Sequence, residues 1–94
     1  MNISQIKGAV LLEIELVIFG EIIRNRRLEL NISQENLALK ADMDRSYVSE
    51  IERGHKNPSL SKILALSSAL ELSVSELFYL FEDSYYKRKT TTNN

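Results

Sequence analysis

SQENLALKADMDRSYVSEIERG, residues 33–54, decides the fold of this 94-residue chain. Ser33 is a residue type that caps helix N-termini, because its hydroxyl accepts a hydrogen bond from a free backbone N–H of the first turn. Leu37 and Ala41 follow at helical spacing and give one apolar face. The pattern predicts a short helix over residues 34–40.

A second short helix follows after a break at residues 41–43. Asp44 is again an N-cap type, Val48 and Ile51 share one side of the predicted helix, and Gly54 is typical of a helix end. Two short helices joined by about three residues predict a helix-turn-helix.

Working outward, residues 19–30 form the first helix of the domain, with Asn31 as its stop. The extension before it, residues 1–18, is ambiguous, because its apolar residues fit both a period of two and one face of a helix. We favour an extended segment for residues 10–17. This stretch contains two Glu residues and falls short of the roughly 20 apolar residues that span a bilayer, so we expect packing surface and no membrane contact.

Two further helices are expected on the C-terminal side. Ser59 caps the fourth, whose core side is predicted to contain four apolar residues: Leu60, Ile63, Leu64 and Leu70. Ser73 and Glu76 have capping-box spacing and open the fifth. The domain therefore covers residues 19–82, and residues 83–94 are predicted to be a disordered polar tail.

Composition supports one all-α domain. The chain is 44% apolar, with three Gly, one Pro and no Cys, so disulfides, Cys-based zinc sites and thiol nucleophiles are excluded and a reducing cytoplasm is consistent. Net charge is −1, but residues 24–62 carry eight Lys or Arg against six Asp or Glu, so the predicted helix-turn-helix lies in a locally basic segment. With one His and no Gly-rich loop, we expect no enzyme, cofactor, metal or small-molecule ligand.

The exposed side of the second short helix is the candidate site. Val48 and Ile51 fix its inward direction, so the residues pointing away from them are candidates to contact DNA bases: Arg45, Ser46, Ser49 and Glu50. Arg45 stands at the helix N-terminus, where its planar fork suits both acceptors of a guanine.

Residues around this helix are candidates for contacts with the DNA backbone. They are Gln34, Tyr47, Arg53, Lys56, Asn57 and Ser59. A capping or solvated side chain is the alternative for each of them taken alone. His55 is expected to be solvated or to face a phosphate, because no second metal ligand lies at a suitable spacing.

The string SQENLALKADMDRSYVSEIERGHKNPSL resembles the Cro and lambda-repressor-like (Xre) family of helix-turn-helix proteins, over residues 19–81. Its second half, DRSYVSEIERGHKNPSL, is most similar to restriction-modification controller proteins, although phage repressors and antitoxins share the framework. The resemblance implies a five-helix domain, base contacts at Arg45, Ser46 and Glu50, and an ion pair between Arg27 and Glu52.

This sequence departs from the family at three places. Asp42 and Glu71 stand where many relatives have Gly at a helix end, and the long N-terminal extension is a third departure, for which the family offers no guidance. Asp tolerates the left-handed backbone conformation better than most residues, so we expect the fold to survive with some strain.

The sequence thus predicts a transcription regulator that binds double-stranded DNA at a pseudo-palindromic operator, as a homodimer. A single recognition helix reads only a few base pairs, which favours duplication. The dimer interface is expected at three residues of the fifth helix, namely Val74, Phe78 and Phe81, because large apolar residues are in surplus there. Leu72 and Leu77 are expected in the core. The alternative is an interaction module that has lost DNA binding.

Overall fold

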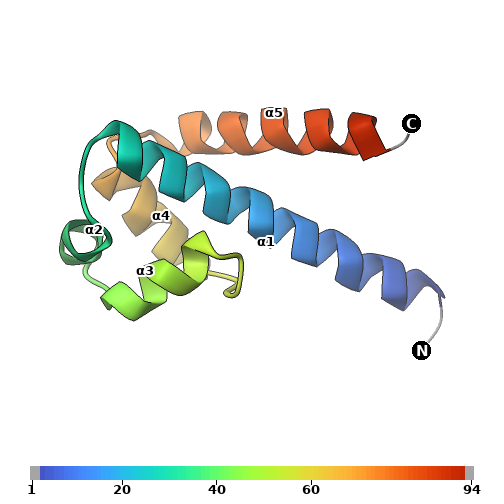
Figure 1. Ribbon diagram of the computed structural model, residues 1–94, viewed down its shortest axis with the longest axis horizontal. Coiled ribbons are helices and arrows are strands. Elements are labelled where there is room, and N and C mark those ends of the chain that lie inside the picture. The colour runs from blue at the N-terminus through green and yellow to red at the C-terminus, as the bar shows by residue number, and fades with distance from the viewer. Residues whose placement is uncertain (1–2, 93–94) are drawn as a thin grey trace.

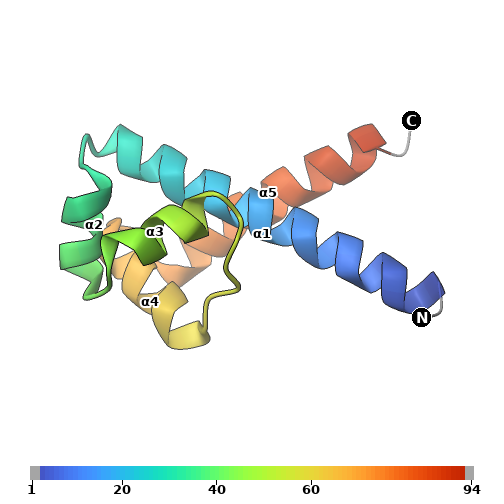
Figure 2. The ribbon, with the colours of Figure 1, turned by 60° about the horizontal axis from the view of Figure 1, so that its bottom comes forward.

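The computed structural model describes residues 3–92 of the backbone and the side chains of residues 13–88. Throughout the described backbone every regular element is a helix. The order along the chain is α1 (Ile3–Glu29), α2 (Gln34–Ala41), α3 (Arg45–Glu52), α4 (Leu60–Ala69) and α5 (Val74–Thr92). Helices α2, α3 and α4 gather around the C-terminal half of α1, while the N-terminal half of α1 and the C-terminal half of α5 project away from them (Figures 1 and 2).

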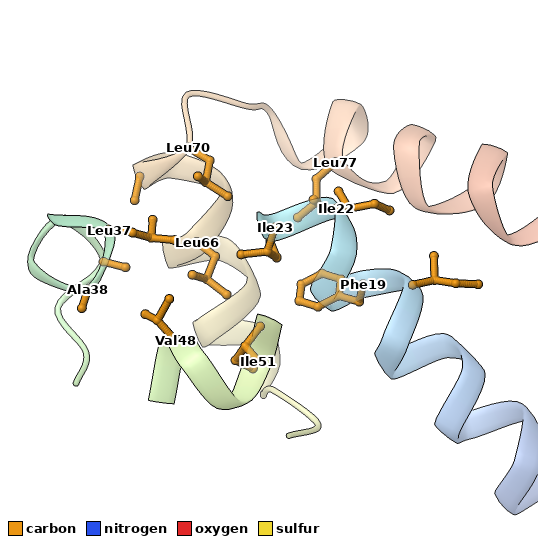
Figure 3. Packing of buried hydrophobic residues seen from close by; sticks show 13 residues of the cluster. Phe19, Ile22, Ile23, Leu37, Ala38, Val48, Ile51, Leu66, Leu70 and Leu77 are labelled. Carbon is orange, nitrogen blue, oxygen red and sulfur yellow. The ribbon is translucent and has the colours of Figure 1, made fainter. Parts of the chain in front are cut away.

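The core is a single apolar cluster to which all five helices contribute. Figure 3 shows Ile23 of α1, Leu37 of α2, Val48 and Ile51 of α3, and Leu66 of α4 converging. Each of these five side chains is at most 1% exposed. Burial of a branched aliphatic side chain of this size stabilises the folded state by about 1.5–3 kcal/mol, so this cluster fixes how α2 and α3 are set against α1.

The prediction of an extended segment over residues 10–17 is wrong, since α1 is continuous through it. Ile14 and Ile18 lie one helical turn apart, and both pack on the core cluster. The same apolar residues that alternate with period two therefore also form a helical stripe. A strand would have needed a neighbour to satisfy its backbone N–H and C=O groups, whereas a helix satisfies them internally.

Residues 83–92, which we predicted to be a disordered tail, continue α5 instead. Tyr85 packs against the core cluster, and Arg88 forms an ion pair with Glu21 of α1, with Nη2 and Oε2 2.8 Å apart. These contacts tie the last turns of α5 to α1. Asn93 and Asn94 lie outside the described residues.

The core side of α4 is also different from the prediction. Leu66, Ala69 and Leu70 are buried, whereas Leu60 and Leu64 are 66% and 43% exposed. At 100° per residue, Leu60 and Leu64 point more than 100° away from the buried Leu66, so both lie off the stripe that meets α2 and α5. Ile63 is half-buried, because it points about 60° away from Leu66 and therefore lies at the edge of the buried stripe.

The predicted N-caps are confirmed at three helices. Ser33 accepts from the Asn36 N–H at 3.0 Å, and Ser59 accepts from the Lys62 N–H at 3.3 Å. At α5 the capping box is complete, since the Ser73 hydroxyl accepts from the Glu76 N–H at 3.0 Å and the Glu76 carboxylate accepts from the Ser73 N–H at 2.9 Å. The hydrogen bond from the Ser73 backbone lowers the pKa of Glu76 below its usual value.

Helix ends are closed by residues in the left-handed conformation. Asn31, Asp42 and Glu71 have φ of 58°, 54° and 58°, and Gly54 has φ of 76°. The N–H of each following residue returns to a carbonyl five residues earlier, for example Met43 to Ala38 at 2.9 Å, which is the Schellman pattern. The expectation of a strained turn at Asp42 is therefore confirmed, and Glu71 is in the same state.

No single helix in the described part of the chain is long and apolar enough to cross a membrane. Helices α4 and α5 reach the required length and hydropathy only when they are taken together, and they are bent by 101° at the break between them.

Candidate nucleic-acid interface

Helix α3 is held by its apolar side and exposes its polar side. Val48 and Ile51 are buried against α1, α2 and α4, while Arg45 and Ser46 are exposed at the N-terminal end. Ser49 lies on the polar side with partial exposure. The structure therefore places these predicted base-contacting residues on one accessible face, as the helical spacing indicated.

Gly20 sets how closely α3 approaches α1. A Cβ atom at this position would lie 2.7 Å from the Glu52 carbonyl oxygen and closer still to that of Ile51. Only glycine permits this distance, because backbone atoms cannot move aside as a flexible side chain could. Nothing in the residue pattern indicated this contact, since glycine within a predicted helix is only mildly unfavourable.

Glu50 is the most constrained of the predicted base-contacting residues. Its Oε1 lies 2.6 Å from Arg53 Nη2, and its Oε2 lies 3.3 Å from His55 Nδ1. Both partners follow Glu50 in sequence and are more than half exposed. The turn after α3 thus places a guanidinium and an imidazole against the Glu50 carboxylate.

A shallow hollow of about 430 Å³ lies beside α3. Its lining residues are Asp44, Ser46, Tyr47, Glu50 and Lys56. Residues predicted to contact bases and residues predicted to contact the DNA backbone therefore meet at one surface. Asp44 has the backbone conformation of an N-cap, but its side chain makes no capping hydrogen bond and remains exposed in this hollow.

Tyr47, Asn57 and Ser59 are three of the residues predicted to contact the DNA backbone, and each is at least partly exposed. Lys62 Nζ lies 5.7 Å from the centre of the Tyr47 ring, a cation–π distance that orients this half-buried ring. Asn57 is exposed in the loop after α3, and Ser59 is exposed while its hydroxyl caps α4. The proximity of Lys62 to Tyr47 was missed because the two residues belong to different helices.

The predicted pair of Arg27 and Glu52 is confirmed. Arg27 Nε and Nη2 donate to the two Glu52 carboxylate oxygens at 2.6 and 3.0 Å, and the Arg27 and Glu52 side chains are 10% and 2% exposed. Arg27 Nη1 also donates to the Ile32 carbonyl at 3.0 Å. The bidentate contact joins the C-terminal end of α3 to α1, and the bond to Ile32 joins α1 to the α1–α2 turn.

Gln34 bridges the buried pair and the exposed face. Its Nε2 donates to Glu52 Oε1 at 2.9 Å, and its Oε1 accepts from Arg45 Nη1 at 3.2 Å. The sequence suggested only a contact with the DNA backbone for Gln34.

Among the described side chains, no three His, Asp or Glu residues lie close enough together to hold a metal ion.

On the C-terminal side, Val74 and Phe78 are 38% and 39% exposed, whereas Phe81 packs partly on the core. The Phe78 and Phe81 rings meet edge to face with centres 6.4 Å apart. Leu77 is fully buried and Leu72 packs on the core cluster, as predicted.

Comparison with known proteins supports the same reading of the fold. The helix-turn-helix family profile matches residues 23–77. Control protein C.BamHI of Bacillus amyloliquefaciens is 44% identical over 62 residues, which cover 65% of this chain and 76% of that protein.

Restriction-modification controller proteins are among the solved structures that are similar to this chain. The restriction-modification controller protein C.AhdI from Aeromonas hydrophila superposes with a TM-score of 0.64 at 47% identity, over 66% of this chain and 94% of that one. The controller protein C.Esp1396I, solved as a tetramer in complex with its natural 35 base-pair operator, gives a TM-score of 0.72 at 30% identity, over 77% and 95%. The chain belongs to the helix-turn-helix family of DNA-binding transcription regulators, which are not enzymes.

Proposed function

We propose that this protein is a sequence-specific transcription regulator that places α3 in the major groove of operator DNA. The observation that carries the proposal is the two-sided character of α3: Val48 and Ile51 anchor it in the core, and Arg45, Ser46 and Glu50 line its accessible side. A helix held in this way fits the major groove, whose edges present a distinct donor and acceptor pattern for each base pair.

Arg45 is the principal base reader in this proposal. It stands at the first turn of α3, the part of a recognition helix that reaches the base edges, and it can bond guanine O6 and N7 together. Ser46 and Ser49 are short enough to bond bases close to the helix. Glu50 can accept from a cytosine amino group, and the Arg53 guanidinium reduces the repulsion between its carboxylate and the DNA.

The DNA backbone is held by the residues around α3. Lys56 and Arg53 supply positive charge, and four residues with at least partial exposure supply neutral polar groups: Gln34, Tyr47, Asn57 and Ser59. Contacts of this kind fix the position of the helix on the duplex without reading its sequence.

We further propose a two-fold symmetric homodimer joined through α5. Val74 and Phe78 expose apolar surface, and Phe78 and Phe81 border a hollow of about 310 Å³ that Tyr85 and another aromatic residue also line. An aromatic side chain of a second copy fits such a hollow, and burying this patch would remove an exposed apolar surface from water.

The similarity to restriction-modification controller proteins leads us to propose that the protein regulates a restriction-modification operon. The C.Esp1396I operator complex is a tetramer on 35 base pairs, so we expect the operator here to hold at least one pair of half-sites about 10 base pairs apart, or a multiple of that. Such a regulator acts where the DNA is, in the cytoplasm.

The first experiment selects bound duplexes from a random-sequence pool and footprints the enriched site. Arg45→Ala should lower affinity for that site by about 1–3 kcal/mol and relax selectivity at one base pair per half-site. Lys56→Ala is the matched control, because it should weaken all sequences alike and lower the salt slope by about 1. Binding that is equally weak for every duplex would contradict the proposal and favour an interaction module.

The dimer is tested by sedimentation of the free protein at micromolar concentration. Phe78→Glu should give a monomer with an unchanged helical spectrum, because Phe78 is substantially exposed. Leu39→Glu, at a residue 75% exposed on α2, is the control that should leave the dimer intact. A wild-type monomer that protects a single asymmetric half-site at saturation would reject the dimer.

A further inference from the structure

Helix α5 has two exposed flanks of different chemistry. The buried Leu77 sets the inward direction of the helix. At 100° per residue, the residues proposed for the dimer turn to one side of this direction, whereas a second set turns about 60–120° to the other side: Glu76, Leu80 and Asp83. The proposed dimer therefore leaves this second flank of α5 unused.

A groove runs between the second flank and the C-terminal half of α1. Its larger part has a volume of about 490 Å³, and its smaller part, of about 160 Å³, shares three lining residues with it: Arg26, Glu29 and Leu80. Leu72 and Ile22 contribute apolar wall to the larger and the smaller part. Helix α5 lies across α1 from α3 (Figure 1), so α1 separates it from the helix proposed to read DNA.

Tyr79 presents an exposed aromatic ring at the edge of the groove. It is 68% exposed, and Leu80 beside it is 38% exposed. Glu76 lies three residues before Tyr79 and Asp83 four residues after it, so all three are neighbours on one side of the helix. An aromatic ring flanked by carboxylates attracts a cation, both through the negative face of the ring and through charge-assisted hydrogen bonds.

The charged groups of the groove leave an excess of negative charge. The lining contains three carboxylates, those of Glu29, Glu76 and Asp83, and one guanidinium, that of Arg26. Arg26 Nε and Nη2 donate to two backbone carbonyls at the C-terminal end of α4, at 2.9 and 3.4 Å, and Nη1 lies 3.4 Å from Glu29 Oε2. Asp83 pairs with Lys87 at 3.0 Å. Glu29 is 65% exposed and Glu76 is exposed, so both carboxylates remain accessible.

We infer that the groove between α1 and α5 is a docking surface for another protein, which inserts a segment that carries an arginine or lysine beside an apolar side chain. The cation stacks on Tyr79, where the Glu29 and Glu76 carboxylates accept its hydrogen bonds, and the apolar side chain packs on Leu80. Arginine suits this site best, because a planar guanidinium can stack and donate at the same time.

The negative charge of the groove also restricts the class of partner. It repels the phosphates of a nucleic acid, so a basic protein segment is the occupant that complements it. The inference goes beyond the proposed function and does not depend on it. A dimer that binds DNA through α3 would still have this groove open on each copy.

The test exposes the full-length protein to a phage-displayed library of random peptides and measures the affinity of synthetic copies of the enriched peptides by fluorescence anisotropy. The enriched peptides should carry arginine or lysine next to an apolar residue. Tyr79→Ala should weaken their binding by about two- to thirtyfold, the range for a cation–π contact. Glu29→Gln should weaken it by about two- to fivefold, and added salt should reduce this difference.

Tyr86→Ala is the matched control, because Tyr86 is a second exposed tyrosine of α5, 58% exposed, that borders the hollow on the opposite flank. It should leave peptide affinity unchanged. All three variants should bind the selected duplex like the wild type, which shows that they fold. Failure of the proposed function is a separate result, since the wild type would then bind every duplex equally whatever the peptides show.

Three results would overturn the inference. The first is that no peptide is enriched on the wild type over Tyr79→Ala. The second is that the enriched peptides lack a basic residue. The third is a lower oligomeric state of Tyr79→Ala in sedimentation, with Tyr86→Ala unchanged, which would assign the groove to a second copy of this chain.

Discussion

Replacing Arg27 by Met measures how strongly the folded state depends on the buried ion pair. The change removes two hydrogen bonds to Glu52 and one to the Ile32 carbonyl. It leaves the Glu52 carboxylate, whose side chain is 2% exposed, with Gln34 as its remaining donor among the contacts described above. Stranding a buried charge in this way costs about 3–5 kcal/mol, because the carboxylate loses its compensation and cannot regain water.

A loss of this size is a large part of the 5–15 kcal/mol that usually separates folded and unfolded states. With a urea slope near 1.5 kcal/mol/M, the unfolding midpoint should fall by about 2–3 M. Glu52→Leu alone should be similarly damaging, because it strands the Arg27 guanidinium. The double variant Arg27→Met/Glu52→Leu removes both charges and should lie within about 1–2 kcal/mol of the wild type, the cost of leaving single polar groups unpaired.

The assay is urea unfolding of the wild type, the two single variants and the double variant, followed by circular dichroism. The coupling free energy of the cycle should exceed about 2 kcal/mol. A value below about 0.5 kcal/mol, the usual limit for independent sites, would refute the reasoning that the pair is mutually compensated.

Three further variants test other features of the fold. Gly20→Ala should destabilise the protein by about 1–3 kcal/mol in urea unfolding and weaken binding of the selected duplex, because its Cβ would overlap the Ile51 carbonyl oxygen and push α3 away from α1; an unchanged midpoint would show that the approach is not close. Glu71→Gly should raise stability by about 1 kcal/mol, since φ of 58° is strained for Glu and free for Gly, and a decrease would contradict this. For Glu76, whose folded pKa is lowered by the Ser73 N–H, the stabilisation is present above the unfolded pKa and is lost as pH falls through the folded pKa. Wild type should therefore lose more stability than Glu76→Gln between about pH 5 and pH 3, and parallel pH profiles would contradict the sign.

The parts of the fold that could be predicted from sequence are those decided locally. Ser33, Ser59 and Ser73 mark helix starts because a Ser hydroxyl just before a helix accepts a hydrogen bond from a free backbone N–H of the first turn. Val48 and Ile51 mark the buried side of α3 because they are aliphatic residues three positions apart, and this spacing puts both on one side of a helix. The candidate face followed from these residues by geometry alone.

The parts that could not be predicted depend on distant contacts. Whether residues 10–17 are helical depends on whether a partner strand exists, and whether residues 83–92 are ordered depends on contacts such as that of Arg88 with Glu21. The arrangement of the site was hidden for the same reason. Gln34 and Arg45 are eleven residues apart, and nothing in their spacing shows that one amide lies between a buried carboxylate and an exposed guanidinium.

The left-handed helix ends at Asp42 and Glu71 have a consequence for how this protein can change over generations. Each holds about 1 kcal/mol of strain that glycine would relieve, and an Asp or Glu codon becomes a Gly codon by one nucleotide substitution. Most amino-acid replacements destabilise a protein by about 0.5–3 kcal/mol. A replacement in α3 that redirected the protein to a new operator could therefore be offset by a single mutation outside α3, which makes new binding specificities easier to reach.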